Sequence, residues 1–289
     1  SKETTANRIR ALERGGVIGG YNSLVNFAKL GKSGYAVFAE LHCTTEKSRQ
    51  RVIHSLRENR NVYWIALLGG RYDLLYALHA KDLVTFNTIH INIQSKLGSS
   101  LRVLEIAPRI EVSHFRRNYL VLRPRKRKSP YFGRDIGVEK IDEFDREILN
   151  ELAKNGREQL SEVARSLNKP RATVQHRVAQ LENSGIIQSY YTQIHAQRFG
   201  FQIYQVLVRT SSKDHDLRDR FYTFSKQHPN ISYFVHAIGP WDFELTLEVP
   251  SATVLQETLN KLRVAFSSEI QNLEVVITFD YYQKWSFEF

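Results

Sequence analysis

The sequence is poor in the residues that build covalent or metal-bound scaffolds. Among its 289 residues there is one cysteine, Cys43, which excludes a disulfide framework and a cysteine-based zinc cluster. The ten histidines show neither HExxH nor HxH spacing, so we expect no metal site. Methionine is absent even from position 1, which we interpret as removal of the initiator or loss of the native start.

Long apolar runs and enzyme signatures are also missing. The chain has no run of about 18 apolar residues and no secretory signal pattern, so we expect a cytoplasmic protein that does not span a membrane. It has no Walker loop, and its GGVIGG stretch follows a helix instead of joining a strand to a helix. We therefore predict that the protein is not an enzyme and has neither catalytic residues nor a cofactor.

Acidic residues are too few to balance the basic ones. The chain holds 41 Lys and Arg against 30 Asp and Glu, which gives a net charge of +11 and a pI near 9.7. Such a surplus favours a polyanionic partner, either nucleic acid or an anionic membrane surface. A basic protein without any such partner is the alternative.

One stretch of the chain occurs twice. Residues 8–21 read RIRALERGGVIGGY, and residues 177–190 read RVAQLENSGIIQSY. The same offset of 169 positions relates Gly16 to Gly185, Tyr21 to Tyr190, Gly31 to Gly200, Gly70 to Gly239, Asp73 to Asp242 and Glu105 to Glu274. A constant offset over so long a unit indicates two modules in tandem, produced by duplication.

The second module begins with three short helices. Apolar residues recur at helical spacing in EFDREILNELAKNG, in LSEVARSL and in PRATVQHRVAQLENSG. In the last of these, Val174, Val178 and Leu181 form one apolar face. Two short helices joined by a tight turn are typical of a helix-turn-helix.

Beyond Tyr190 the apolar pattern alternates between strand and helix spacing. QIYQVLVR, ISYFVHAIG, DFELTLEV and IQNLEVVITFDYY are predicted strands, and HDLRDRFYTFSKQ and SATVLQETLNKLRVAF are predicted helices. The first module repeats this order from YAVFAEL to LRVLEIAPRIEV. The order β-α-β-β-α-β is the ferredoxin-like arrangement, in which helices cover one face of an antiparallel sheet.

These patterns together predict an α+β protein with five segments. They are a remnant of a first helix-turn-helix (1–21), a first ferredoxin-like domain (22–114), a basic linker (115–140), a helix-turn-helix domain (141–190) and a second ferredoxin-like domain (191–289).

A helix-turn-helix that ends in TVxxRVxxLExxGIIxxY, followed by this fold with a G-x-x-D hairpin, resembles the leucine-responsive regulator/AsnC family of transcription factors. The resemblance extends over residues 1–112 and again over residues 141–282. It implies a winged helix-turn-helix that binds double-stranded DNA, joined to a RAM-type domain that forms oligomers and binds a small effector, often an amino acid.

The repeat also bears on how the chain begins. Ser1 corresponds to Pro170, so the first helix-turn-helix is truncated and only its recognition helix is present. We expect that residues matching 141–169 were lost upstream, by processing, choice of fragment or disorder. Natural degeneration of the first unit is the alternative.

The second helix of a helix-turn-helix places its N-terminal part against base edges in the major groove. Arg171 suits guanine and Gln175 suits adenine, because these side chains form bidentate hydrogen bonds with those bases. We expect His176 to contact phosphate and Arg177 to contact phosphate or support the fold. The candidate DNA-binding residues of this helix are Arg171, Thr173, Gln175, His176, Arg177 and Gln180. For any one of them, a solvated helix face is the alternative.

The segment between the modules is strongly basic. Residues 116–134 contain eight Lys or Arg and no acidic residue. We predict that this linker follows the DNA backbone through Arg125, Lys126, Arg127 and Lys128. A linker that only improves solubility is the alternative.

The two G-x-x-D hairpins read GGRYD and IGPWD. In the family that the chain resembles, small ligands bind near this hairpin, which implies effector contacts from Gly70, Arg71, Asp73, Gly239, Trp241 and Asp242. Arg71 can pair with an acidic ligand at the first hairpin, whereas Trp241 narrows the site at the second. We therefore expect two non-equivalent sites, of which the first prefers a more acidic ligand. An ordinary tight turn is the alternative.

One face of each predicted sheet is left uncovered by helices. It carries Leu75, Ala77 and His79 in the first module and Glu244, Thr246 and Glu248 in the second. We expect these faces to meet, within one chain or between chains, and we favour a homo-oligomer.

Two other functions are compatible with the pattern. Some haem-precursor decarboxylases resemble the same two-module architecture, and such an enzyme would need a basic pocket for a tetrapyrrole and the use of His79, His90 or His236. The second of these functions is that of an adaptor that binds an effector but not DNA.

Overall fold

The computed structural model describes residues 1–120, 129–134, 137–211 and 214–283. It contains two β-α-β-β-α-β units, as expected. The first consists of β2 (Ser33–Leu41), α2 (Glu46–Glu58), β3 (Val62–Gly69), β4 (Leu74–Ala80), α3 (Leu83–Leu97) and β5 (Leu101–His114). The second consists of β8 (Gln202–Thr210), α7 (Leu217–Gln227), β9 (Ile231–Ala237), β10 (Phe243–Val249), α8 (Ala252–Ala265) and β11 (Ile270–Gln283). The α+β fold class is confirmed.

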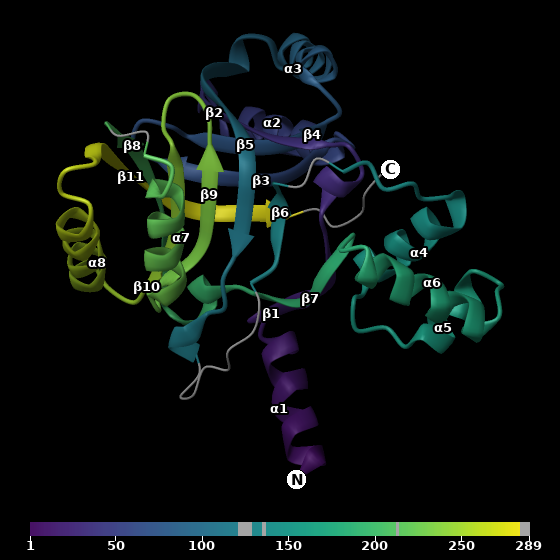
Figure 1. Ribbon diagram of the computed structural model, residues 1–289. Coiled ribbons are helices and arrows are strands. Elements are labelled where there is room, and N and C mark those ends of the chain that lie inside the picture. The colour runs from purple at the N-terminus through teal and green to yellow at the C-terminus, as the bar shows by residue number, and fades with distance from the viewer. Residues whose placement is uncertain (121–128, 135–136, 212–213, 284–289) are drawn as a thin grey trace.

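The two units share one closed barrel of antiparallel strands (Figure 1). Their own strand orders are β5-β2-β4-β3 and β11-β8-β10-β9. The long strands β5 and β11 then continue into the other unit, where β5 pairs with β9 and β11 pairs with β3. Because both junctions are hydrogen-bonded, the two uncovered sheet faces meet inside a single chain.

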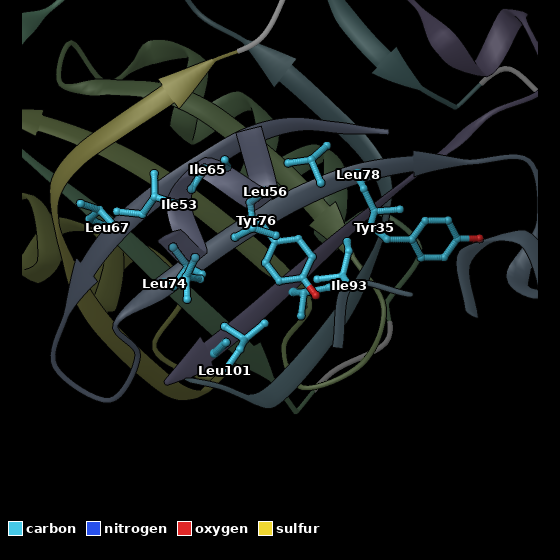
Figure 2. Packing of buried hydrophobic residues seen from close by; sticks show 14 of the residues in the cluster. Tyr35, Ile53, Leu56, Ile65, Leu67, Leu74, Tyr76, Leu78, Ile93 and Leu101 are labelled. Atoms are coloured by element: carbon cyan, nitrogen blue, oxygen red, sulfur yellow. The ribbon is translucent and has the colours of Figure 1, made fainter. Parts of the chain in front are cut away.

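The helices lie outside the barrel and cover a core on each unit. Helix α2 starts with a capping box between Thr45 and Ser48 and buries Val52, Ile53 and Leu56. Figure 2 shows this core, in which Leu56 and the fully buried Tyr76 lie among aliphatic side chains of the sheet. Burying each such large apolar side chain contributes about 1.5–3 kcal/mol.

The inward-facing residues of the two sheets form a separate core in the barrel. On the first unit, Ala36 and Ala66 leave room beside Phe38, and all three are fully buried. Trp241 of the second unit fills this room, and its ring meets that of Phe38 edge-on with centroids 4.7 Å apart. Successive strand residues face opposite sides, so the same strands supply the outer cores and this inner one.

A two-stranded ribbon connects the barrel to the remaining helices. Strand β1 (Ile18–Val25) pairs antiparallel with β7 (Ile187–Ile194). Helices α4 (Glu143–Lys154), α5 (Leu160–Ser166) and α6 (Arg171–Asn183) form the helix-turn-helix bundle beside it. Helix α1 (Lys2–Arg14) projects from the barrel and buries none of its residues (Figure 1). No helix of the described residues is long and apolar enough to cross a bilayer.

The segment 115–140 differs from the expected linker. It contains a short helix (Asn118–Leu120) and the strand β6 (Tyr131–Gly133), which pairs with β5. Val138 forms a bridge with Leu30. The side chain of Arg117 is buried in the barrel, because the carboxylate of Glu248 balances its charge there. A linker prediction made from charge alone misses such a pair.

Candidate DNA-binding unit and inter-sheet cavity

The helix-turn-helix bundle has an apolar core shared by its three helices. Asp142 caps α4 and forms a capping box with Asp145. The buried apolar residues of the bundle are Ile148, Leu149, Leu152, Val163, Ala164, Val174, Val178 and Leu181. Val25 and Phe27 pack against them, although both belong to the first module. The bundle is therefore attached to the ribbon by packing as well as by the chain.

Helix α6 presents the expected surface. Its candidate base-contacting side chains are all exposed, and they are Arg171, Thr173, Gln175, His176 and Gln180. Val174, Val178 and Leu181 are buried on the opposite face. The N-terminal half of α6 is thus an exposed polar surface on a packed three-helix core, an arrangement that recognition helices share.

Arg177 has a supporting position at the base of the bundle. Its guanidinium donates to Asp142 at 2.6 Å and to Asp145 at 3.2 Å. The hydrogen bond to Asp142 and the charge of Asp145 raise the pKa of Arg177. Of the two roles expected for this residue, its contacts favour support of the fold, because they join α6 to the start of α4.

The basic run Arg125, Lys126, Arg127 and Lys128 lies outside the described residues, so its contact with DNA stays a prediction.

Each module contains the same contact between its recognition helix and its ribbon strand. The Tyr190 hydroxyl donates to Glu182 at 2.7 Å, and the Tyr21 hydroxyl donates to Glu13 at 2.8 Å. The two pairs are related by the 169-residue offset. Helix α1 thus retains the position of a recognition helix relative to β1, without helices equivalent to α4 and α5 among the described residues.

The aspartates of the two hairpins have equivalent partners. Asp73 accepts a hydrogen bond from the backbone N–H of Leu41 at 2.9 Å, and Asp242 accepts one from Thr210 at 2.7 Å. Asp242 also accepts from the Thr210 hydroxyl at 2.9 Å. Both carboxylates therefore link their hairpin to the first strand of the unit.

The other hairpin residues differ between the copies. Gly70 and Gly239 both have positive φ, 116° and 123°, which glycine adopts without steric strain. Arg71 is half-exposed and pairs with Glu105 at 2.9 Å. Trp241 is 4% exposed and donates to Glu244 at 3.1 Å, so its indole belongs to the barrel core.

A cavity of about 540 Å³, partly open to solvent, lies between the two units. Both modules contribute to its wall. The first provides Phe27, Tyr63, Trp64, His79, Arg109 and Arg117, and the second provides Tyr191, Gln205, Tyr233, Glu244, Thr246 and Glu248, among others. The sheet faces identified from sequence therefore do face each other, and their polar residues line the space between them.

Two buried ion pairs lie on the wall of this cavity. Arg109 donates to Glu244 at 2.6 Å, and the side chains are 6% and 2% exposed. Arg117 donates to both oxygens of Glu248 at 2.7 and 2.8 Å, and to the hydroxyl of Tyr191. Burial lowers the pKa of each arginine, but the facing carboxylates and tyrosines raise it by more than burial lowers it. Both arginines therefore remain charged.

His79 lines the same cavity between two aromatic rings. It stacks on Tyr63 with centroids 4.1 Å apart and lies 4.4 Å from the ring of Phe27. Burial, together with the charges of Lys32 and Arg109, lowers the pKa of His79 to about 3. It is therefore neutral at neutral pH.

The other two histidines considered for a tetrapyrrole site do not line the cavity. His90 is a buried residue of α3 and lies 3.3 Å from the Tyr76 hydroxyl, and His236 packs near Phe243. Within the described ranges no group of three or more His, Cys, Asp or Glu is placed to hold a metal ion.

Sequence reasoning missed Arg109 and Arg117 as cavity residues. Arg109 lies in the predicted strand LRVLEIAPRIEV, and its charge was the available signal. The acidic row of Glu244 and Glu248 on a predicted strand was the complementary signal, because a buried charge requires an opposite one.

The sequence of the helix-turn-helix matches a known family model. Residues 141–188 match winged helix-turn-helix DNA-binding domains. The fold and the exposed α6 thus define a winged helix-turn-helix protein with an attached pair of ferredoxin-like units.

Relatives make the class more specific. The chain is 28% identical over 122 residues to the HTH-type transcriptional regulator LrpC of Bacillus subtilis, a match that covers 42% of this chain and 83% of LrpC. It is 26% identical over 141 residues to LrpA of Mycobacterium tuberculosis, covering 49% of this chain and 93% of LrpA. The resemblance to the leucine-responsive regulator/AsnC family is confirmed, and the chain is a relative of these regulators.

The fold of the whole chain is similar to that of a solved enzyme structure. The siroheme decarboxylase NirDL, in complex with an iron-uroporphyrin III analogue, superposes with a TM-score of 0.65 at 7% identity. The match covers 100% of this chain and 85% of NirDL. At this identity the match shows a shared tandem fold.

Proposed function

We propose that the protein is a sequence-specific DNA-binding transcription regulator. The observation that carries this proposal is helix α6, which presents Arg171, Thr173, Gln175, His176 and Gln180 to solvent from a winged helix-turn-helix. The relatives LrpC and LrpA are transcriptional regulators, and the net charge of +11 is suited to a polyanion.

The proposal is tested by selecting bound fragments from genomic DNA and measuring affinity for them. Arg171→Ala and Gln175→Ala should each weaken specific binding by about 5- to 150-fold, because a bidentate base contact contributes about 1–3 kcal/mol. Lys96→Ala, an exposed change on α3, is the matched control and should leave affinity unchanged. Equal affinity for selected and random DNA would contradict the proposal.

The basic linker contributes phosphate contacts under this proposal. Replacing Arg125, Lys126, Arg127 and Lys128 with glutamine should weaken binding to specific and to random DNA about equally. It should also reduce the slope of log affinity against log salt concentration by about 0.9 per lost phosphate contact. The intact protein should lose about 10³–10⁵ in affinity between 50 and 200 mM salt if 6–10 phosphates are neutralised. A flat salt dependence would argue against these contacts.

An amino-acid effector at the hairpins is a further part of the proposal. A Cβ atom at Gly70 would meet nothing within 4 Å, whereas one at Gly239 would lie 3.1 Å from the carbonyl oxygen of Ile106. Arg71 is half-exposed beside the first hairpin, which therefore has the more open site. Calorimetry with an amino-acid panel against Asp73→Ala and Asp242→Ala tests it. If an amino acid binds and neither change weakens binding, the hairpins serve only as turns.

We also propose that the chain forms homo-oligomers. The two sheet faces already meet within one chain, so the contact between chains would use outer surfaces instead. Light scattering at a mass of one chain, 33.6 kDa, would contradict this.

We favour a regulator over a tetrapyrrole decarboxylase. The shared fold with NirDL and the cavity between the two units support the enzyme. However, the deep arginines Arg109 and Arg117 are each paired with a glutamate, so their charge is already balanced and they offer little to a ligand with many carboxylates. Addition of an iron-uroporphyrin should therefore give no saturable change in Soret absorbance, whereas tight binding would support the enzyme.

A further inference from the structure

The cavity wall contains polar groups that the protein leaves without partners. On the described chain, the buried atoms Arg109 Nε, Gln205 Nε2 and Thr278 Oγ1 have no hydrogen-bond partner and belong to residues that line the cavity. Gln205 and Thr278 are 3% and 2% exposed. Nε of arginine and Nε2 of glutamine are donors only, so each is available to an acceptor from outside the protein.

The fixed partners of these residues leave the free donors available. Gln205 Oε1 accepts from the Thr246 hydroxyl at 2.9 Å, which holds the amide with its NH₂ group unpaired. Arg109 uses Nη2 for Glu244. By contrast, Arg117 directs Nε and both Nη groups to Glu248 and Tyr191, so each of its three nitrogens already has a partner. The unpaired donors therefore lie at the Arg109 end and in the middle of the cavity.

The strand β10 spaces three polar groups along one wall of the cavity. Glu244, Thr246 and Glu248 alternate along one face of β10, and four residues of extended strand span about 13 Å. One ion pair lies at each end of this row, and at its centre the Gln205 amide accepts a hydrogen bond from Thr246.

The remaining wall is largely aromatic. Tyr63 and Trp64 of β3 lie near Arg109, whose Cζ is 5.9 Å from the Trp64 ring. Tyr191, Tyr233 and Tyr281 line the other end. Flat rings gain about 0.5–1.5 kcal/mol from each aromatic neighbour beyond the area that they bury.

We propose that this cavity binds a planar aromatic molecule that carries one carboxylate or carboxamide. Its ring lies among the aromatic side chains, and its oxygen accepts hydrogen bonds from Arg109 Nε and Gln205 Nε2. A single acceptor group suits a wall whose arginines are already neutralised by Glu244 and Glu248.

The cavity also adjoins the helix-turn-helix. Val25 and Phe27 line the cavity and at the same time pack in the core of the bundle. Tyr191 of the ribbon strand β7 accepts from Arg117 at 2.7 Å on the cavity wall. A ligand that shifts these side chains changes the placement of α6, so the ligand acts as an effector; this step rests on the proposed DNA binding.

Binding is tested by calorimetry on the full chain without DNA. The probes are indole-3-acetate, indole-3-acetamide and 3-methylindole, which has the same ring without an acceptor. The two acceptor probes should bind at least tenfold more tightly than 3-methylindole. Arg109→Lys keeps the charge opposite Glu244 but removes Nε, and Gln205→Leu removes the amide donor; each should reduce this preference about tenfold, the size expected for one hydrogen bond to a charged or buried group.

Two controls keep the test specific. Arg263→Lys, an exposed change on α8 outside the cavity, should not change the affinities. Ile203→Trp fills the cavity and should abolish binding of all three probes while the circular dichroism spectrum is retained. Absence of binding to the wild-type chain, equal binding of 3-methylindole, or unchanged preference in both donor variants would overturn the site.

Coupling is tested separately by titrating selected DNA with and without saturating indole-3-acetate. A change in DNA affinity of at least fivefold, matched by an equal change in probe affinity when DNA is present, supports the effector role, since coupling is reciprocal. Unchanged DNA affinity with intact probe binding overturns the effector role. Absence of DNA binding in either condition counts against the proposed regulator and leaves the calorimetric result on the cavity standing.

Discussion

At the scale of single residues, the barrel interior is organised around buried charge. Glu248 accepts hydrogen bonds from Nε and Nη2 of Arg117 and from the Tyr119 hydroxyl, and its side chain is 2% exposed. Such a pair is stable because each charge satisfies the other, and either one alone in this position would be strongly unfavourable.

We therefore predict that Glu248→Ala destabilises the protein by about 3–5 kcal/mol, because it leaves Arg117 buried without a counter-charge. The double variant Arg117→Leu/Glu248→Leu should be clearly more stable than Glu248→Ala. Urea unfolding provides the measurement. Arg71→Ala, which breaks an exposed pair, is the control and should change stability by about 0–1 kcal/mol. If Glu248→Ala lost no more stability than this control, water would have to solvate Arg117.

His79 predicts how stability depends on pH. Its pKa is lowered from 6.5 to about 3 in the folded state, so between these values the unfolded chain binds the extra proton. The stability that His79 contributes is present above pH 6.5 and is lost as the pH falls toward 3. At pH 5 the loss is about 2 kcal/mol.

His79→Phe retains the stacking on Tyr63 and Phe27 and should remove this part of the acid destabilisation. The measurement is the difference in unfolding free energy between pH 7 and pH 5. His54→Gln, at a side chain 72% exposed, is the control and should behave as the wild type. The same slope in all three proteins would contradict the assignment.

At the scale of elements, the ribbon of β1 and β7 is the joint between barrel and DNA-binding unit. Gly156, just after α4, donates its backbone N–H to the carbonyl of Tyr21 at 2.7 Å. A Cβ atom at Gly156 would lie 2.5 Å from the carbonyl carbon of Asn22, so the two backbones approach as closely as glycine allows. The placement of the bundle on the ribbon depends on this contact.

Gly156→Ala should therefore destabilise the bundle by about 1–3 kcal/mol through overpacking against backbone atoms. Gly137→Ala is the matched control, because a Cβ there meets nothing within 4 Å. Hydrogen exchange of α4 and α6 amides should increase in the first variant and not in the second. Equal exchange in both would show that the ribbon moves to accommodate the methyl group.

At the scale of the whole molecule, the two ferredoxin-like units form one barrel. The strands β5 and β11 each pair with strands of both units, and Trp241 of the second unit packs on Phe38 of the first. Neither unit can unfold without exposing the inner core of the other. The barrel should therefore behave as one cooperative unit.

Single-tryptophan variants test this cooperativity. Trp241→Phe/Trp285→Phe leaves Trp64 in the first unit as the fluorophore, and Trp64→Phe/Trp285→Phe leaves Trp241 in the second. Within either variant, denaturant unfolding followed by fluorescence should have the same midpoint as the loss of sheet followed by circular dichroism. Distinct fluorescence and sheet transitions in the same variant would show that the units unfold independently.

The sequence by itself determined the modules, because their signals are local. The 3.6-residue apolar period of α6 and the strand patterns on either side of the hairpins depend on neighbours in the chain, and duplication presents each pattern twice. The exposed face of α6 follows from the same period, so the candidate DNA contacts were predictable from the sequence.

Only the tertiary structure decided how the modules meet. Strand pairings such as β5 with β9 join residues more than a hundred positions apart, and no local pattern distinguishes a partner within the chain from one in another chain. The pairing of Arg117 with Glu248 was hidden for the same reason, since the sequence shows charge but not which charge lies opposite. The cavity and its unpaired donors exist only once the two sheets face each other, because each wall comes from a different module.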